Sequence, residues 1–593
     1  MLDILAKKCR KDIIQMIMNA GSGHIGGALS SIDIYISVLD AMSETDRLIV
    51  SHGHTSAALY SALGNMGYFD ISEAIDKFRR CRPYEGHPST EVNGVEWCSG
   101  SLGQGLSVGC GFAIAKKIKK EPGNIFVVMG DGEQQKGQLQ EAREFAVNHK
   151  LDNLIAIIDC NGLQASGEIP DTDTLTDKYK MSGWNVITVD GHCFDEIHNA
   201  IKGHRKPLCI IAKTVMGKGI PEIENDHHYH GTVISKDLAE KYIEKFSISE
   251  KEQELLEGFH KRNVSKAEIP LVSNKIGRVY SSYTDIRTAM GNALADVATE
   301  NPQVPILAFD CDLTESVKLT EFKKLRPDSF IECGIAEHNA ATAAAAAAKS
   351  GVIAIHADFS MFNIAETYSQ IRIADINKSP LKLFCTHAGL DVGEDGKTHQ
   401  CIDYLSLLSN LYGFKVIIPA DANQADAAVR YAMSVPYPVA IIGGRSKMPI
   451  LTDYRGNNLD FQYGSSQWLR RGNDGAIVTY GNMVHRAVTA SDELRKSGIE
   501  IGVLNCPTPC DIETDDVLEA AKTGFVITYE DHNVKTGIGG EIAKTICQSG
   551  LSCRLECLGV VKYGSSTSPN TLYKEQGLDV DSLINLIKKK EGR

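Results

Sequence analysis

The sequence contains no apolar run that could cross a membrane and no excess of basic residues. Its longest nearly apolar stretch, Ala340–Ala348, is interrupted by Thr342 and ends before Lys349, whereas a membrane helix needs roughly 20 apolar residues. The 75 Asp and Glu residues outnumber the 62 Lys and Arg and give a net charge of -13. Such a charge disfavours generic binding to nucleic acid or anionic membranes. We therefore expect no membrane partner and no nucleic-acid partner.

A secretory signal is also missing from the first segment. Lys7, Lys8, Arg10 and Lys11 lie in the middle of the first apolar stretch, where a signal peptide keeps an uncharged core. The 16 cysteines are scattered and stand mostly in apolar runs, as expected of reduced core residues in a large chain. These features predict a cytoplasmic protein.

Two cysteine pairs leave one alternative open. Cys506 and Cys510, like Cys553 and Cys557, have three residues between them, and the four thiols together would suit a zinc ion. This interpretation is the less favoured one, because Cys506 closes a strand-like run and the others also stand in apolar contexts.

What the sequence does contain is ordinary globular composition in a long chain. The 593 residues are 43% hydrophobic and 23% charged, which is enough for several cores and unlike a disordered, collagen-like or coiled-coil chain. At about 150 residues per domain, the length is compatible with three or four domains.

Short apolar runs alternate with helical patterns along almost the whole chain, which indicates parallel α/β sheets. Most runs end in Gly, Asp or Asn, as buried parallel strands do where they lead into a loop. The runs form three groups: 124–132, 151–162 and 206–214; then 304–310, 351–357, 381–389, 414–421 and 438–444; then 475–481, 500–505, 524–531 and 554–560.

We therefore predict an α/β fold of three consecutive domains with mainly parallel sheets. The expected boundaries are 1–270, 271–455 and 456–593. The polar stretch 236–275 lacks strand-like runs, and we expect it to be a helical connector at the end of the first domain.

An acid and an amide follow two neighbouring strands of the first group. Gly130-Asp131-Gly132 ends one strand, and Asn161 follows the next one after 28 intervening residues. Carboxyl ends of parallel strands meet at one sheet edge, where ligands of open α/β sheets bind. Asp131, Asn161 and the Leu163 carbonyl would offer Mg²⁺ (or Ca²⁺) three oxygens, with a diphosphate and water completing the shell. The glycines let the backbone approach a phosphate closely.

The stretch 130–162 resembles the thiamine-diphosphate motif of the transketolase family. The similarity extends upstream through SGHIGGALS (22–30), SHGHTSAALY (51–60), GHP (86–88) and GSLGQGLSVG (100–109). Downstream it includes HHYHG (227–231) and continues to EDHNVKTGIGGE (530–541). The resemblance thus covers essentially the whole chain.

The resemblance implies thiamine diphosphate as the cofactor and identifies residues that would hold it. Glu337, in GIAEHNAATAAAAAA (334–348), matches the acid that hydrogen-bonds the pyrimidine ring and drives it to its imino form. Phe362 and Phe359, in DFSMF (358–362), match the aromatic slot for that ring. The other implied cofactor contacts are His54, Gly100, Leu102, Gly130, Asp131, Gly132, Asn161, His227 and Asp312.

The resemblance further implies a polar site around the reacting carbonyl. Neutral imidazoles can relay protons near pH 7, and the implied catalytic residues beside Glu337 are His24, His54, His87, His227 and His399. Asp395, in THAGLDVGEDGKTHQ (386–400), would accept a hydrogen bond from the C2 hydroxyl of the substrate and select its configuration.

Arg287, Ser316, His387 and Arg445 fall where the family grips the far end of a phosphorylated sugar. The planar guanidinium pairs bidentately with phosphate, although a sulfonate would fit nearly as well. The full implied substrate set is His24, His87, Arg287, Ser316, His387, Asp395, His399 and Arg445.

Three positions depart from the family pattern. Lys136 replaces a Glu that the family ties to the dimer interface and to communication between its two sites, Ser101 stands where Pro is common, and Ala365 replaces an aromatic residue. The first departure puts the coupling of two sites in doubt, and the last one opens the aromatic slot on one side.

The resemblance implies a transketolase that moves a two-carbon ketol unit from a ketose phosphate to an aldose phosphate. It also implies a homodimer with active sites at the interface. Three alternatives stay open: the same chemistry on a branched or sulfonated ketose, an enzyme like 1-deoxyxylulose 5-phosphate synthase, and a non-catalytic cofactor-binding relative. Retention of His24, His87, His387, Asp395 and His399 favours ketol transfer over the synthase, and intact Glu337, Asp131 and Asn161 argue against the non-catalytic relative.

Overall fold

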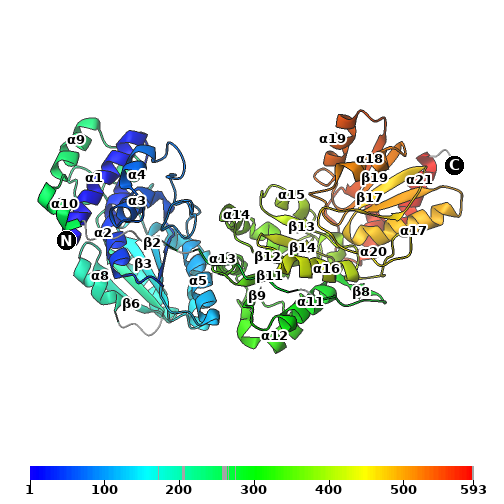
Figure 1. Ribbon diagram of the computed structural model, residues 1–593, viewed down its shortest axis with the longest axis horizontal. Coiled ribbons are helices and arrows are strands. Elements are labelled where there is room, and N and C mark those ends of the chain that lie inside the picture. The colour runs from blue at the N-terminus through cyan, green and yellow to red at the C-terminus, as the bar shows by residue number, and fades with distance from the viewer. Residues whose placement is uncertain (171, 203–206, 257–263, 265, 274, 591–593) are drawn as a thin grey trace. The chain divides into compact units, whose positions relative to one another are not determined.

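The structure is a computed structural model that describes residues 1–593 except 171, 203–206, 257–263, 265, 274 and 591–593. The chain divides into two compact units, Met1–Glu268 and Ile269–Arg593. The main sheet of the first unit has five parallel strands, and the two main sheets of the second unit have six and five strands (Figure 1). The predicted α/β class with mainly parallel sheets is confirmed.

The sheet of the first unit has the strand order β1-β2-β3-β7-β6, with all neighbours parallel. Every residue of β3 is buried, as a continuous apolar run requires when helices cover both faces of a sheet. The strands are β1 (Arg47–Val50), β2 (Ile125–Gly130), β3 (Leu154–Cys160), β6 (Asn185–Asp190) and β7 (Leu208–Lys213). A short hairpin of β4 (Leu163–Gln164) and β5 (Gly167–Glu168) follows β3.

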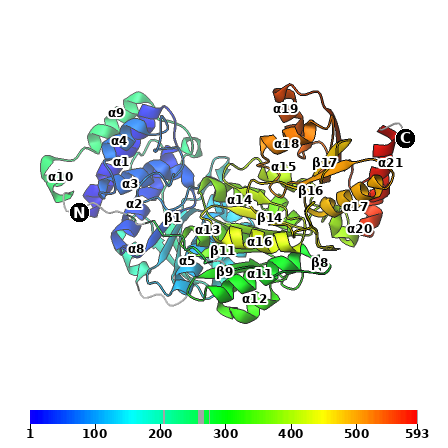
Figure 2. The same cartoon turned by 45° about the vertical axis from the view of Figure 1, so that its right-hand side comes forward.

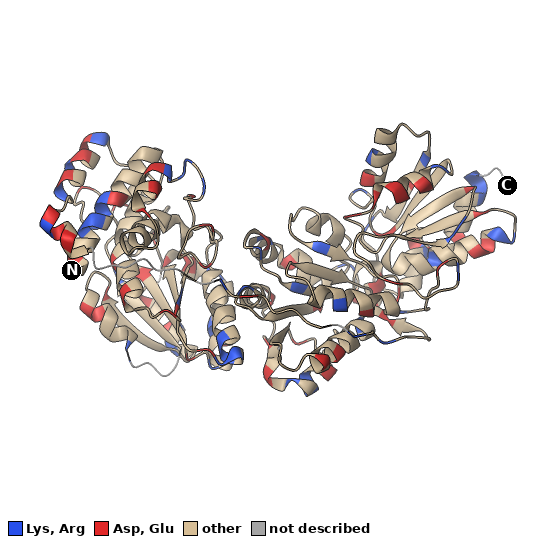
Figure 3. Cartoon of the chain, viewed as in Figure 1, with Lys and Arg blue, Asp and Glu red and all other residues tan. Residues whose placement is uncertain are grey.

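Helices pack around this sheet and continue beyond its last strand. They are α1 (Leu2–Ala20), α2 (Ile25–Ala41), α3 (Ser56–Asn65), α4 (Ile71–Lys77), α5 (Gly105–Lys119), α6 (Gln138–Asn148), α7 (Leu175–Met181), α8 (Phe194–Ile201), α9 (Lys236–Lys245) and α10 (Glu250–Leu256). The predicted connector is partly α9 and α10, whose outer surfaces mix acidic and basic residues (Figure 3). Tyr242 and Phe246 join the core shared with α1, so this segment is an integral layer of the first unit. Residues 257–263, 265 and 274 of the predicted connector lie outside the described residues.

The second unit begins with a six-stranded parallel sheet in the order β10-β9-β11-β12-β14-β13. Its strands are β9 (Ile306–Asp310), β10 (Phe330–Glu332), β11 (Ile353–Phe359), β12 (Lys382–Thr386), β13 (Lys415–Ile417) and β14 (Val439–Ile442). Its helices are α11 (Ile286–Glu300), α12 (Thr320–Leu325), α13 (Glu337–Lys349), α14 (Tyr368–Ile376), α15 (Tyr404–Leu408) and α16 (Ala422–Met433). The alanine-rich α13 is buried along ten consecutive residues, 339–348, and lies against β9 and β11 (Figure 2). β8 (Thr284–Asp285), which precedes α11, forms a small antiparallel pair with β15 (Lys447–Met448), which follows β14.

The last sheet has the order β16-β18-β17-β19-β20, and only its edge strand β16 is antiparallel to its neighbour. The strands are β16 (Gln467–Arg470), β17 (Gly475–Thr479), β18 (Ile501–Asn505), β19 (Phe525–Asn533) and β20 (Arg554–Val560). The helices are α17 (Val484–Arg495), α18 (Thr514–Ala521), α19 (Gly539–Ser549), α20 (Pro569–Glu575) and α21 (Val580–Lys590).

Residues of the C-terminal domain form hydrogen bonds with a loop that follows β12 of the six-stranded sheet. Asp531 on β19 is buried and accepts a hydrogen bond from the Leu390 backbone N–H at 2.9 Å and from the Tyr573 hydroxyl at 2.7 Å. The Ser566 hydroxyl donates to the Glu394 carbonyl. The loop 389–395, which carries Asp395, is therefore fixed from the C-terminal domain.

In the part of the chain that the structure describes, no helix combines the length and the hydropathy that a bilayer crossing requires. The four cysteines considered for zinc do not gather into a group of potential metal ligands, and Cys510 and Cys557 are exposed whereas Cys506 is buried. The zinc alternative at these cysteines is therefore wrong.

Gly109 on α5 allows this helix to approach β2 closely, since a Cβ there would lie 2.4 Å from Val127 Cγ2. We expect Gly109→Ala to lower the free energy of unfolding of the first unit by about 2 kcal/mol through overpacking. Differential scanning calorimetry measures this loss of stability as a lower midpoint temperature of the first unfolding transition. Gly540→Ala on α19 is the control, because a Cβ there meets nothing within 4 Å. An equal loss in both variants would contradict tight packing at Gly109.

Candidate functional site

A cavity of about 310 Å³ lies at the carboxyl edge of the first sheet. The loops after β2 and β3 bring Asp131 and Asn161 to its wall, as the spacing predicts. The predicted residues that line it are His54, Leu102, Gly130, Asp131, Gly132, Asn161 and Leu163. Seven positions chosen from the sequence thus share one cavity.

The Asp131 carboxylate ties the two loops together. One oxygen accepts the Gly132 N–H at 2.8 Å, and the other accepts the Gly162 N–H at 2.6 Å. Burial raises the pKa of Asp131 to about 7 against these hydrogen bonds, so a nearby cation would strongly favour its ionised form. The Asn161 side-chain oxygen accepts the Leu163 N–H at 3.0 Å, which orients the amide at the same edge.

Two further acids, which sequence reasoning missed, lie in the cavity wall. Glu133 is buried and accepts N–H groups from Gly103 at 2.6 Å and Gly130 at 2.9 Å. Asp159, at the end of β3, accepts hydroxyl hydrogen bonds from Ser30 at 2.7 Å and Ser31 at 2.5 Å. Their contacts span up to 129 residues of sequence, so no local pattern points to them.

Three histidines cluster beside this cavity. Ring centroids of His24 and His54 are 5.2 Å apart, and His230 lies 5.9 Å from the first and 5.2 Å from the second. Burial lowers the pKa of His24 to about 4, with the charge of Arg79 lowering it further. Burial likewise holds the pKa of His54 well below its usual range. These imidazoles are therefore neutral at pH 7 and able to exchange protons with a hydroxyl group.

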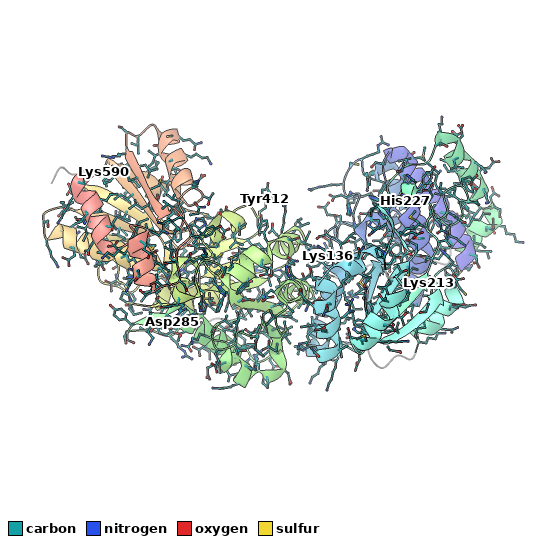
Figure 4. The ribbon with its side chains drawn as sticks, turned by 180° about the vertical axis from the view of Figure 1, so that it is seen from behind. Lys136, Lys213, His227, Asp285, Tyr412 and Lys590 are labelled. Atoms are coloured by element: carbon teal, nitrogen blue, oxygen red, sulfur yellow. The ribbon has the colours of Figure 1, made fainter. Side chains whose placement is uncertain are left out.

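His227 does not line the cavity, whereas His230 does. His227 packs against the exposed His228, with ring centroids 4.2 Å apart, and Figure 4 shows it well separated from Lys136 within the first unit. The motif HHYHG contains both candidates, and only the turn between them decides which one faces inward.

His87 lines a neighbouring hollow of about 580 Å³ together with Arg79 and Ser22. A Cβ on Gly100 would approach the His87 ring at 3.8 Å. Arg79 donates to His24 Nδ1 at 3.1 Å, which connects the hollow to the histidine cluster. Lys136 is exposed, and its stem covers Gly103.

The second unit brings together the aromatic and phosphate-gripping candidates. Phe359 stacks on His387 with ring centroids 3.7 Å apart, and Phe362 lies 6.1 Å from Phe359 and 5.3 Å from His399. Arg287 donates to the Ser316 carbonyl at 3.0 Å and lies 3.2 Å from His387 Nε2. Burial lowers the pKa of His387 to about 3, and Arg287 and Arg445 lower it further.

Arg445 is already engaged by acids of the loop 389–395. It contacts Asp395 at 3.2 Å and Glu394 at 3.1 Å, and its own carbonyl accepts a hydrogen bond from Arg287 at 3.1 Å. The guanidinium is one-third exposed, so an anionic ligand can compete for it.

Glu337 is the first residue of α13, and Asp312 follows β9. Burial raises the pKa of Asp358 well above its usual range, and the charge of Glu337 raises it further. Asp312 and His387 hold left-handed backbone conformations, with φ of 60° and 56°. Strained conformations of this kind gather at functional sites.

Three family models match consecutive parts of the chain. Their descriptions are transketolase thiamine diphosphate binding domain for residues 3–269, transketolase pyrimidine binding domain for 282–450, and transketolase C-terminal domain for 464–583. Human transketolase is 30% identical over 98% of this chain and 96% of its own length. Transketolase-like protein 2 of Bos taurus is also 30% identical, over 92% and 90%.

Solved structures show the same architecture. A transketolase from Campylobacter jejuni superposes with a TM-score of 0.84 at 25% identity, and the match covers 99% of each chain. A Pichia stipitis transketolase in complex with sedoheptulose 7-phosphate has the same fold, with a TM-score of 0.84, 24% identity and coverage of 99% and 96%. Fold and matches define a three-domain protein with thiamine diphosphate-binding domains. Within that class, the chain belongs to the transketolase family.

The contact between Arg79 and His24 predicts a measurable electrostatic coupling. We expect Arg79→Gln to raise the pKa of His24, because it removes a positive charge 3.1 Å from Nδ1. Nitrogen-15 NMR of labelled histidine follows the titration, with His24→Asn assigning the signal. Arg80→Gln, at an exposed neighbouring position, is the control and leaves the titration unchanged. A His24 pKa that stays constant in Arg79→Gln would refute the coupling.

Proposed function

We propose that this protein is a transketolase, which transfers a two-carbon ketol unit from a ketose phosphate to an aldose phosphate. The observation that carries the proposal is that a chain of the transketolase family has both expected sets of site residues, one in each of two domains. In the thiamine diphosphate-binding domain, Asp131 and Asn161 line a cavity beside neutral histidines. The pyrimidine-binding domain presents Arg287, His387 and Arg445 around the loop of Asp395.

The residues present fit thiamine diphosphate with a divalent metal. Asp131, Asn161 and the Leu163 carbonyl form an oxygen donor set at one cavity wall, as Mg²⁺ prefers. Gly27 also lines the cavity, and a Cβ there would fit in ordinary contact with Thr55 at 3.4 Å and His54 at 3.5 Å, so the glycine leaves open a part of the cavity that a larger side chain would fill. When bound, thiamine diphosphate supplies the nucleophilic carbon that carries the two-carbon fragment.

The chain's own residues would then transfer protons and orient the cofactor and the sugar. Glu337 is the acid proposed to contact the pyrimidine ring. His24, His54 and His230 would take and return protons at the sugar hydroxyls, since neutral imidazoles accept them; His230 replaces His227 in this role because it lines the cavity. His87 and His399 remain candidates beside them, and Phe359 and Phe362 would form the aromatic slot.

Asp395 and Arg445 would select the sugar. The Asp395 carboxylate would accept a hydrogen bond from the C2 hydroxyl, and the guanidinium groups of Arg287 and Arg445 would grip the phosphate with His387 and Ser316. We also propose a homodimer that shares its active sites between copies, as the family resemblance implies, and a cytoplasmic location, as the charged first segment and the scattered cysteines suggest.

A second candidate is the same chemistry on a branched or sulfonated ketose. It is favoured by the two carboxylates, Glu394 and Asp395, that hold Arg445 at 3.1 and 3.2 Å. These contacts weaken the net positive charge available to a dianionic phosphate.

The test is a transfer assay by mass spectrometry with xylulose 5-phosphate and ribose 5-phosphate, with and without thiamine diphosphate and Mg²⁺. We expect a seven-carbon ketose phosphate that appears only with the cofactor. Glu337→Gln is expected to lower kcat by at least about 100-fold, as loss of acid–base assistance does, at an unchanged melting temperature. Cofactor binding without any transfer by the unsubstituted protein would favour the unusual ketose. Near-normal turnover in Glu337→Gln would show that Glu337 is not the acid that contacts the pyrimidine ring.

The proposed phosphate contact of Arg445 predicts a KM change that depends on whether the donor carries a phosphate. We expect Arg445→Ala to raise KM for phosphorylated sugars about 10- to 100-fold, the value of a charge-assisted hydrogen bond. KM for hydroxypyruvate, which has no phosphate, should change little. Steady-state kinetics with both donors measures the difference, and Arg455→Ala, an exposed position, is the control. Equal effects on both donors would show that Arg445 does not bind phosphate.

A further inference from the structure

A separate group of potential metal ligands lies in the sheet of the pyrimidine-binding domain. Cys311 directly follows β9, and His356 and Asp358 stand on β11. Their accessible fractions are 3%, 0% and 0%. The ligand atoms that they offer all lie within 4.8 Å of one another. None of the three belongs to the cofactor or substrate residues assigned above.

The strand register produces this cluster. β9 and β11 pair in parallel with Ala357 opposite Asp310, so the next residues, Asp358 and Cys311, emerge side by side. His356 and Asp358 are two residues apart on one strand and therefore share a face. His356 Nε2 lies 3.9 Å from Cys311 Sγ and 3.9 Å from Asp358 Oδ2.

The hydrogen bonding of the cluster is incomplete. Asp358 Oδ1 accepts the Phe359 N–H at 2.6 Å, while Oδ2, which faces His356, has no hydrogen-bond partner. Asp310 Oδ1, on the neighbouring strand, is also buried without one. Within the described part of the chain, the only ion-pair contact of Asp358 is the long one to His356. A buried carboxylate oxygen without a partner is costly, and a cation between these side chains would remove that cost.

We propose that Cys311, His356 and Asp358 bind a zinc ion, with Cys333 as a further ligand. A thiolate, an imidazole and a carboxylate form a donor set that suits zinc and not magnesium. Because β10 pairs with β9 and places Glu332 opposite Asp310, Cys333 and Cys311 are the next residues of two neighbouring strands.

Distances and charge both agree with zinc. Metal bonds of about 2.0–2.3 Å in a tetrahedron put ligand atoms about 3.3–3.8 Å apart, so the two separations of 3.9 Å from His356 Nε2 need only a small contraction. The thiolates of Cys311 and Cys333, the Asp358 carboxylate and Zn²⁺ sum to a net charge of -1, so the metal neutralises most of the charge that its ligands would bury. Asn363 donates to the His356 backbone carbonyl at 3.0 Å and so holds the strand beside the cluster, while Nδ1 of the imidazole is buried without a hydrogen-bond partner.

The site would also fix the loop that presents the proposed activating acid. Cys333 stands four residues before Glu337 in the sequence CGIAE. A metal held by Cys311 and Cys333 would join the end of β9 to this loop. Zinc binding itself does not depend on the proposed transfer activity.

The test is the metal content of the purified full-length protein, measured by inductively coupled plasma mass spectrometry after dialysis. We expect about one zinc ion per chain, and a loss to about one-tenth or less in Cys311→Ala, as removal of a ligand from a closed site predicts. Cys209→Ala, at an equally buried cysteine on β7, is the matched control and keeps its zinc. Zinc absent from the unsubstituted protein after growth with added zinc, or retained in full by Cys311→Ala, would overturn the proposal.

Cobalt substitution supplies a readout of the ligands themselves. Co²⁺ added to the metal-free protein should produce a thiolate-to-cobalt charge-transfer band and the intense visible bands of a tetrahedral site. Should Cys311→Ala fail to fold, Cys333→Ala serves in its place, because Cys333 is only half-buried; its cobalt band should weaken. His228→Ala removes a member of the partly exposed Asp226, His227 and His228 group and should leave the spectrum unchanged. A spectrum lost in His228→Ala and kept in Cys333→Ala would place the metal at the other group and reject the proposal.

Discussion

The carboxylate of Asp131 is the contact on which the thiamine diphosphate-binding domain depends. Its two oxygens accept N–H groups from Gly132 and Gly162, so the loops that end two neighbouring strands share one buried anion. Parallel strands deliver their loops to one edge, but they do not set the distance between them. The shared carboxylate sets it, and the cavity, the amide of Asn161 and the histidines around them are arranged about this point.

In the pyrimidine-binding domain, the guanidinium cation of Arg287 joins several segments, as the Asp131 carboxylate joins two loops. Arg287 contacts the Ser316 carbonyl, His387 and the Arg445 carbonyl, which come from three separate segments. Its positive charge also contributes to keeping His387 neutral. One guanidinium thus positions the groups proposed to bind a phosphate and controls the protonation of one of them.

The sequence was sufficient to predict the α/β class, the alternation that separates three sheets and the meeting of Asp131 with Asn161. These features depend on local apolar runs and on the fixed geometry of parallel strands. The roles of Glu133, Asp159 and His230 could not be predicted, because their positions depend on contacts distant in sequence or on the direction of one turn. The stretch after residue 236 is helical over α9 and α10, as expected, but its packing could not be predicted, because its polar surface gives no sign that Tyr242 and Phe246 face the core. The roles assigned to the individual site residues remain predictions.

Asp531 gives the C-terminal domain a direct hold on a loop of the pyrimidine-binding domain. This one buried carboxyl accepts the Leu390 N–H and the Tyr573 hydroxyl, and so it anchors the loop that ends in Asp395. If Asp395 selects the substrate as proposed, the selectivity would depend on a residue of another domain. A substitution at that support could then alter which sugar is accepted while the proposed substrate residues stay the same.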